Sequence, residues 1–91
     1  MNRVEVDCVI ANDLGLHLRA AAEFVKLADR FAADVTLGVG RDIVNGKSII
    51  ALVTLAATKG TSVQLIAEGE DASSVATALA GLIEDRFGED R

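Results

Sequence analysis

The residues of this chain that could do chemistry gather around its single histidine. His17 stands two residues after Gly15 and two residues before Arg19, and a run of helix-forming residues follows. We therefore expect the imidazole at a junction of loop and helix, where unpaired backbone N–H groups and a partial positive charge favour phosphate. Arg19 adds a fixed cation with a planar fork suited to phosphate oxygens. The segment predicts a histidine that accepts a phosphoryl group, with an ordinary solvated loop histidine as the alternative.

A second candidate is Ser48, which follows the turn signal Asn45-Gly46 and precedes the apolar run from Ile49 to Ala56. Serine is a preferred residue at the position before a helix, because its hydroxyl accepts a hydrogen bond from a free backbone N–H group. This structural role alone would explain Ser48, so a functional role needs further support.

The periodicity of apolar residues predicts the elements that position these two side chains. Residues alternate between apolar and polar in strands and recur at three and four positions in helices. We expect strands over about 4–10, 35–39, 42–44 and 63–67, and helices over about 18–30 and 49–56. A third helix is expected after Asp71, with an apolar stripe formed by Val75, Leu79, Leu82, Ile83 and Phe87. Lys59-Gly60 is expected to close the second helix and Asp71 to cap the third. The last four residues, 88–91, are expected to be frayed.

This element order predicts an α+β fold. Two strand–helix–strand units form an open-faced β-sandwich of order βαββαβα, with three helices on one face of a four-stranded antiparallel sheet. The 91 residues are expected to make a single domain, since no linker or repeat divides them.

Composition excludes several classes of function. The net charge of −5 and the absence of Trp and Tyr disfavour nucleic acid and anionic membranes as partners. The apolar runs are too short to span a bilayer, and from the opening residues we expect no signal peptide. One cysteine and one histidine fall short of any metal site, so we expect no metal and no cofactor. A lone Cys8 fits a reducing cytoplasm and is expected to be a small buried hydrophobe, in a chain expected to be monomeric.

Residues 15–21, with the sequence Gly-Leu-His-Leu-Arg-Ala-Ala, resemble the phosphorylation motif of the HPr family. These proteins are the histidine phosphocarriers of the bacterial sugar phosphotransferase system, and their element order matches the one expected here along essentially the whole chain. The resemblance implies that His17 accepts the phosphoryl group on Nδ1 and that Arg19 assists. It also implies phosphorylated enzyme I as donor and IIA-type proteins as acceptors.

The resemblance extends to residues 46–50, Gly-Lys-Ser-Ile-Ile. In many HPr proteins a serine at this spacing is phosphorylated, so the resemblance implies regulation at Ser48 by HPr kinase/phosphorylase. It also implies that partner proteins contact the surface formed by four residues: Ala20, Ile49, Ile50 and Val53. Simple core packing is the alternative for the last three.

Several positions depart from the family pattern. Leu18 replaces a small residue, Ala20 replaces a common proline, and Asp29 and Ala51 stand where lysine is frequent. The nitrogen-related branch of the family, NPr, therefore stays open. Two other functions also remain: a regulatory HPr-like binding protein without sugar transport, and a small-molecule-sensing α+β module that resembles ACT domains.

A phosphocarrier must keep its phosphohistidine from hydrolysis, which favours an exposed site without a general base. In the sequence the carboxylate nearest to His17 is Asp13. We expect Asp13 to be a solvated turn residue rather than a partner of the imidazole.

Overall fold

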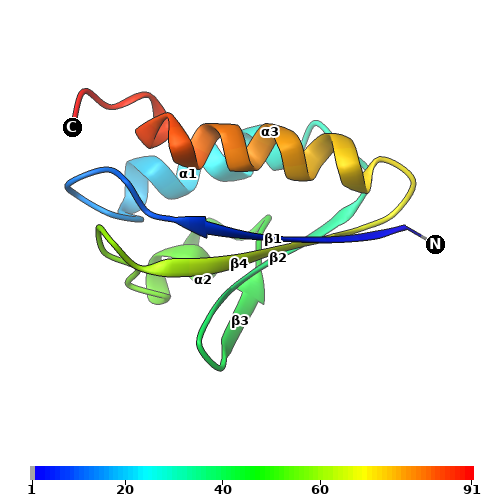
Figure 1. Ribbon diagram of the computed structural model, residues 1–91, viewed down its shortest axis with the longest axis horizontal. Helices are drawn as coiled ribbons and strands as arrows, with labels where there is room; N and C mark the ends of the chain where they lie inside the picture. The colour runs from blue at the N-terminus through cyan, green and yellow to red at the C-terminus, as the bar shows by residue number, and fades with distance from the viewer. Residues whose placement is uncertain (1) are drawn as a thin grey trace.

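The computed structural model describes residues 2–91 and shows the expected element order (Figure 1). The elements are β1 (Arg3–Val9), α1 (Leu18–Ala28), β2 (Asp34–Val39), β3 (Asp42–Asn45), α2 (Ile49–Thr54), β4 (Ser62–Glu68), α3 (Ala72–Glu84) and the short 3-10 turn η1 (Arg86–Gly88). The four strands form one sheet in the order β1-β4-β2-β3, and every neighbouring pair is antiparallel. The predicted α+β fold class is confirmed.

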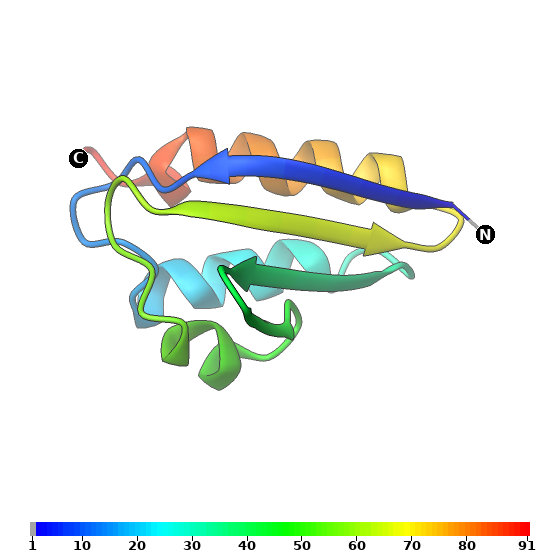
Figure 2. The same ribbon diagram turned by 60° about the horizontal axis from the view of Figure 1, so that its bottom comes forward.

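The two longer helices, α1 and α3, lie together against the sheet (Figure 1). The shorter α2 packs beside the first half of α1 and against β3, at the edge of the sheet (Figure 2). This arrangement brings the start of α1 and the end of the chain to one end of the molecule (Figure 2). His17 and Arg19 lie at that end, and α2 packs beside α1.

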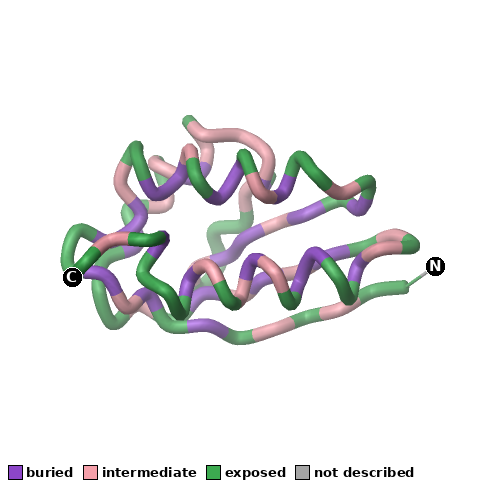
Figure 3. The backbone as a smooth tube through the Cα atoms, turned by 90° about the horizontal axis from the view of Figure 1, so that it is seen from above, coloured by how far each residue is buried: buried purple, intermediate pink, exposed green. Residues whose placement is uncertain are grey.

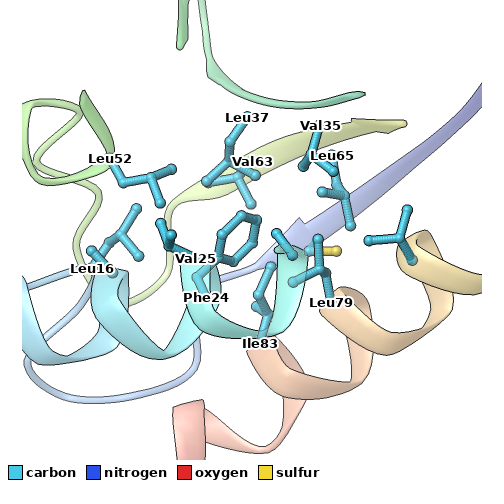
Figure 4. Close-up of a cluster of buried hydrophobic side chains, with 14 of the residues drawn as sticks. Leu16, Phe24, Val25, Val35, Leu37, Leu52, Val63, Leu65, Leu79 and Ile83 are labelled. Atoms are coloured by element: carbon cyan, nitrogen blue, oxygen red, sulfur yellow. The ribbon is translucent and has the colours of Figure 1, made fainter. Parts of the chain in front are cut away.

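The core forms where the apolar stripes of α1 and α3 meet the alternating residues of the sheet (Figure 4). Phe24 of α1 is fully buried, with Leu65 of β4 and Leu79 of α3 buried in the same cluster. Figure 3 shows the same pattern along each long helix, where buried and exposed positions alternate with the helical repeat. Burial of apolar area on this scale is the main stabilising term for so short a chain.

Three predicted boundaries are corrected by the structure. Helix α1 ends at Ala28 rather than Arg30, and α2 ends at Thr54 rather than near Ala56. Lys59-Gly60 does not close α2: Ala56 has already left the helix with φ +53°, and the backbone N–H of Gly60 donates to Ile10 O at 2.8 Å. Packing of the 57–61 segment against the loop before α1 therefore overrides the local capping signal.

Asp71 occupies the position before α3, but its side chain makes no capping bond to that helix. Its carboxylate instead accepts hydrogen bonds from the backbone N–H groups of Ala32 and Ala33, at 2.9 and 2.8 Å. These bonds lower the pKa of Asp71, the bond from Ala32 most, against a smaller opposing effect of burial. Asp71 thus ties the turn after α1 to the start of α3, and the predicted cap is wrong.

The predicted fraying of residues 88–91 is also wrong. Arg86 and Phe87 adopt φ values of +57° and +56°, which turn the chain back after α3. The Phe87 side chain is buried, as its place in the predicted apolar stripe required, and the backbone N–H of Asp13 donates to Arg91 O at 3.1 Å. The tail is docked onto the loop before α1.

Cys8 is buried in β1, as predicted. Burial raises the pKa of its thiol, and the nearby charges of Glu84 and Asp7 raise it further. No helix within residues 2–91 has the length and apolar character needed to cross a bilayer. In that same range no group of three or more histidine, cysteine or acidic side chains is placed to hold a metal ion.

Candidate functional site

The loop that carries His17 is held against the turn after α2. Leu16 donates its backbone N–H to Ala57 O at 2.8 Å, and Gly15 has φ +67°. A Cβ at Gly15 would lie 2.4 Å from Ala57 O, so the loop comes too close to that turn for any side chain. Glycine at this position therefore serves both the turn and the close approach of two backbones.

His17 is the residue immediately before α1. Its backbone is extended, with φ −80° and ψ −179°, and its oxygen accepts the first helical bond from the N–H of Ala21 at 2.8 Å. The imidazole makes no capping bond to the helix, so the N–H groups of the first turn are not taken up by this side chain. The predicted junction of loop and helix at His17 is present.

Arg19 lies on the first turn of α1, exposed, and lines the same surface hollow of about 740 Å³ as His17. The other walls are the loop residues 13–14, Glu23 and the tail 87–91. Among the residues that the structure describes, none forms a salt bridge with Arg19. Its guanidinium is therefore available to an incoming anion.

Glu89 is a neighbour of His17 that the sequence did not reveal. Its Oε2 lies 2.6 Å from His17 Nε2, although 72 positions separate the two residues. The nearest carboxylate in sequence, Asp13, instead accepts a 2.8 Å hydrogen bond from Lys59 Nζ. The available signal for Glu89 was Phe87, an aromatic residue whose burial brings the tail back toward the loop.

The second oxygen of Glu89 is also held. Asn12 is fully buried and donates its side-chain N–H groups to Glu89 Oε1 at 3.0 Å and to Gly15 O at 2.8 Å. Burial is the largest effect on the pKa of Glu89 and raises it. The hydrogen bonds from His17 and Asn12, with the charges of His17 and Arg19, outweigh that effect and lower the pKa. Glu89 is therefore a carboxylate near neutral pH.

Ser48 caps α2, as predicted: its Oγ accepts a hydrogen bond from the N–H of Ala51 at 3.2 Å. Beyond it Ile50 is 72% exposed, while Ile49 and Val53 are half-buried. Ala20 is 0% exposed, so its side chain cannot contact a partner, and we remove it from the predicted surface. Small size at position 20 serves the packing of α1.

Two exposed leucines near His17 had not been predicted as part of a surface. Leu14 and Leu18 are 71% and 63% exposed, one before and one after the histidine. The Nζ of Lys47, just before α2, donates to Phe31 O at 2.8 Å, which holds that side chain toward the turn after α1. The exposed surface beside His17 thus includes two apolar side chains.

A family model described as "PTS HPr component phosphorylation site" matches residues 4–85. The chain belongs to the HPr family. The phosphocarrier protein HPr of Pseudomonas putida is 49% identical over 84 residues, covering 91% of this chain and 93% of that protein. The crystal structure of HPr from Thermoanaerobacter tengcongensis matches all of both chains with a TM-score of 0.88 and 38% identity.

The phosphocarrier protein NPr of Shewanella violacea is also similar to this HPr-family chain, at 33% identity over 89 residues, with 98% of each chain covered. Both branches of the family therefore match across nearly the whole length. The chain is similar to members of both branches.

Proposed function

We propose that this protein is a histidine phosphocarrier, in which His17 accepts a phosphoryl group from phosphorylated enzyme I and passes it to IIA-type proteins. The observation that carries the proposal is the place of His17 directly before α1 in a chain of the HPr family. An imidazole at that place has a helix N-terminus beside it, where a phosphoryl group is favoured.

Arg19 supports the same proposal. Phosphoryl transfer spreads negative charge over three equatorial oxygens, so positioning and positive charge supply most of the catalysis. Arg19 shares the hollow with His17 and forms no salt bridge with any described residue, so it can turn to these oxygens. The first-turn N–H groups of α1 add further hydrogen-bond donors.

The exposed apolar side chains around His17 are the proposed docking surface for enzyme I and IIA-type proteins. The exposed Leu14 and Leu18 form one part of this surface. The exposed Ile50 and the half-buried Ile49 and Val53 form the other part, which lies nearby because α2 packs directly beside α1. Contiguous exposed apolar residues are typical of protein-binding surfaces.

We expect a monomer located in the cytoplasm, and size-exclusion chromatography with light scattering tests the oligomeric state.

Regulation at Ser48 by HPr kinase/phosphorylase forms part of the proposal. Ser48 already accepts a bond from the N–H of Ala51, and a phosphate on its Oγ would add about −1.5 to −2 charges at the start of α2. Those charges would repel an acidic partner surface and slow transfer to or from His17.

The decisive experiment is mass spectrometry after incubation with phosphoenolpyruvate and enzyme I of the same bacterium. We expect the gain of one acid-labile phosphoryl group, which His17→Ala lacks and Ser48→Ala retains. No gain with an enzyme I that phosphorylates a known HPr would refute the carrier function and favour a regulatory or sensing role.

A further inference from the structure

The tail residue Glu89 is built into the site rather than lying against it by chance. Its side chain is 16% exposed and that of His17 is 27% exposed, and their 2.6 Å contact is shielded from much of the solvent. Asn12 holds the other oxygen of the carboxylate, and Phe87 anchors the tail in the core. Each of these contacts limits the positions that the Glu89 carboxylate can take.

The contact determines which nitrogen of the neutral ring carries the proton. An ionised carboxylate can only accept hydrogen bonds, so the 2.6 Å contact requires the proton on His17 Nε2. A neutral imidazole has one N–H, and its other nitrogen, Nδ1, then carries the free lone pair. The other charged groups around the hollow are Asp13, Arg19, Glu23, Asp90 and Arg91. None of them hydrogen-bonds to the imidazole.

We propose that Glu89 is a positioning residue for phosphotransfer, which keeps the ring proton on His17 Nε2 and thereby leaves Nδ1 as the nucleophile. This inference rests on the proposed function, in which His17 is the phosphoryl acceptor. It adds to that function a residue outside the histidine motif.

The Nδ1 lone pair forms a bond to phosphorus while the bond from phosphorus to the donor atom breaks, and that electron pair stays with the donor. The ring then bears phosphorus on Nδ1 and a proton on Nε2, and it carries one positive charge. Glu89 faces that charge, and charge-assisted hydrogen bonds of this kind are stronger than neutral ones.

The same contact favours the onward step. When an acceptor attacks phosphorus, the bond between Nδ1 and phosphorus breaks and its electron pair returns to Nδ1. Because Nε2 has kept its proton, the ring leaves as neutral imidazole rather than as an anion. Glu89 therefore supports transfer in both directions without acting on water.

The test compares the wild type with Glu89→Leu, which retains bulk but removes the acceptor, and with Asp85→Leu as the matched control, because Asp85 is an exposed acidic residue at the end of α3 that does not line the hollow. The ¹⁵N chemical shifts of His17, measured where the ring is neutral, report the proton position directly. We expect the wild type and the control to hold the proton on Nε2. Glu89→Leu should show a measurable shift toward the form protonated on Nδ1.

The rate of phosphorylation by enzyme I is the second readout. We expect it to fall by about tenfold in Glu89→Leu, the lower end of the loss seen when the hydrogen-bond partner of a metal-ligating histidine is removed, and to stay unchanged in Asp85→Leu. Unaltered ¹⁵N shifts and rate in a folded Glu89→Leu would overturn this inference alone. A wild-type protein that takes no phosphoryl group on His17 would overturn the proposed function as well, so the two failures are distinguishable.

Discussion

Asn12 holds Glu89 from inside the protein, because its fully buried side chain donates a 3.0 Å hydrogen bond to Glu89 Oε1. The same amide donates to Gly15 O at 2.8 Å, two residues before His17. The loop and the tail are therefore joined by one side chain. The geometry around the imidazole depends on a residue that lies outside the histidine motif.

Replacing Asn12 with aspartate tests this link. Asn12→Asp removes both donated bonds and sets a carboxylate beside Glu89, so we expect a loss of about 2 kcal/mol or more in the free energy of unfolding. Asn45→Asp is the control, because Oδ1 of Asn45 accepts a bond that aspartate can keep. Urea denaturation measures both, and equal losses would contradict the role of Asn12.

The close approach at Gly15 predicts a second effect. Gly15→Ala forces a Cβ against Ala57 O, at 2.4 Å, in addition to a positive φ. Gly40→Ala is matched, because Gly40 has φ +60° but open space around its Cβ position. We expect about 1 kcal/mol of destabilisation at Gly40 from the backbone conformation alone and clearly more at Gly15. Slower phosphorylation should appear only in Gly15→Ala, and thermal unfolding with an enzyme I assay checks both points.

Arg19 should affect transfer and not stability. We expect Arg19→Gln to lower the rate of phosphorylation by roughly 10²-fold, as loss of one transition-state donor does. Its free energy of unfolding should stay within about 0.5 kcal/mol of the wild type, as for other exposed positions. Lys26→Gln removes the same charge from an exposed position of α1 outside the hollow. Equal rates for the two variants would remove Arg19 from the mechanism.

Variants of Ser48 can separate its capping role from the effect of a negative charge at this position. Ser48→Ala should cost about 1 kcal/mol through the lost cap, whereas aspartate and asparagine both serve as caps. Ser48→Asp is therefore expected to be stable and to accept phosphate more slowly than Ser48→Asn, since only aspartate adds negative charge. Stopped-flow phosphorylation of the two variants makes the comparison, and identical rates would count against regulation at this serine.

The Asp71 carboxylate predicts a dependence of stability on pH. Its pKa is lowered in the folded protein, chiefly by the bond from the N–H of Ala32. The stability it contributes is therefore present above the unfolded pKa near 4 and is lost as the pH falls through the folded pKa. Asp71→Asn should be destabilised at pH 7 and approach the wild type near pH 2, while Glu70→Gln, an exposed change in the same turn, should not. A constant difference across that range would argue against the ionised carboxylate.

Local pattern was enough to predict the four strands and three α-helices of residues 2–91, but not the short 3-10 turn η1. The alternation expected for residues 63–67 is present in the burial pattern of β4, and Leu79, in the apolar stripe expected for the third helix, is buried in α3. The junction of loop and helix at His17 and the cap at Ser48 were also predicted, because both depend on neighbours within four residues. Where only nearby residues decide a conformation, residue type and spacing are sufficient.

The errors arose where distant segments compete for the same polar groups. Asp71 is a good cap by type, yet it bonds to the N–H groups of Ala32 and Ala33, which lie in a turn far away in the sequence. Ala20 suits a surface by its place in the motif, but the packing of α1 buries it. In both cases the outcome depends on which segment the fold brings nearby.

The histidine, its arginine and the start of the helix are determined by the amino-acid sequence itself, since a seven-residue stretch carries them. The carboxylate that contacts the imidazole is determined only by the tertiary structure. Phe87 is buried, and its burial turns the tail back after α3. Asn12 then donates a hydrogen bond to Glu89, which lies beside a histidine 72 positions away. A hydrogen bond over such a separation has no local signal, because it exists only after the core between the two segments has formed.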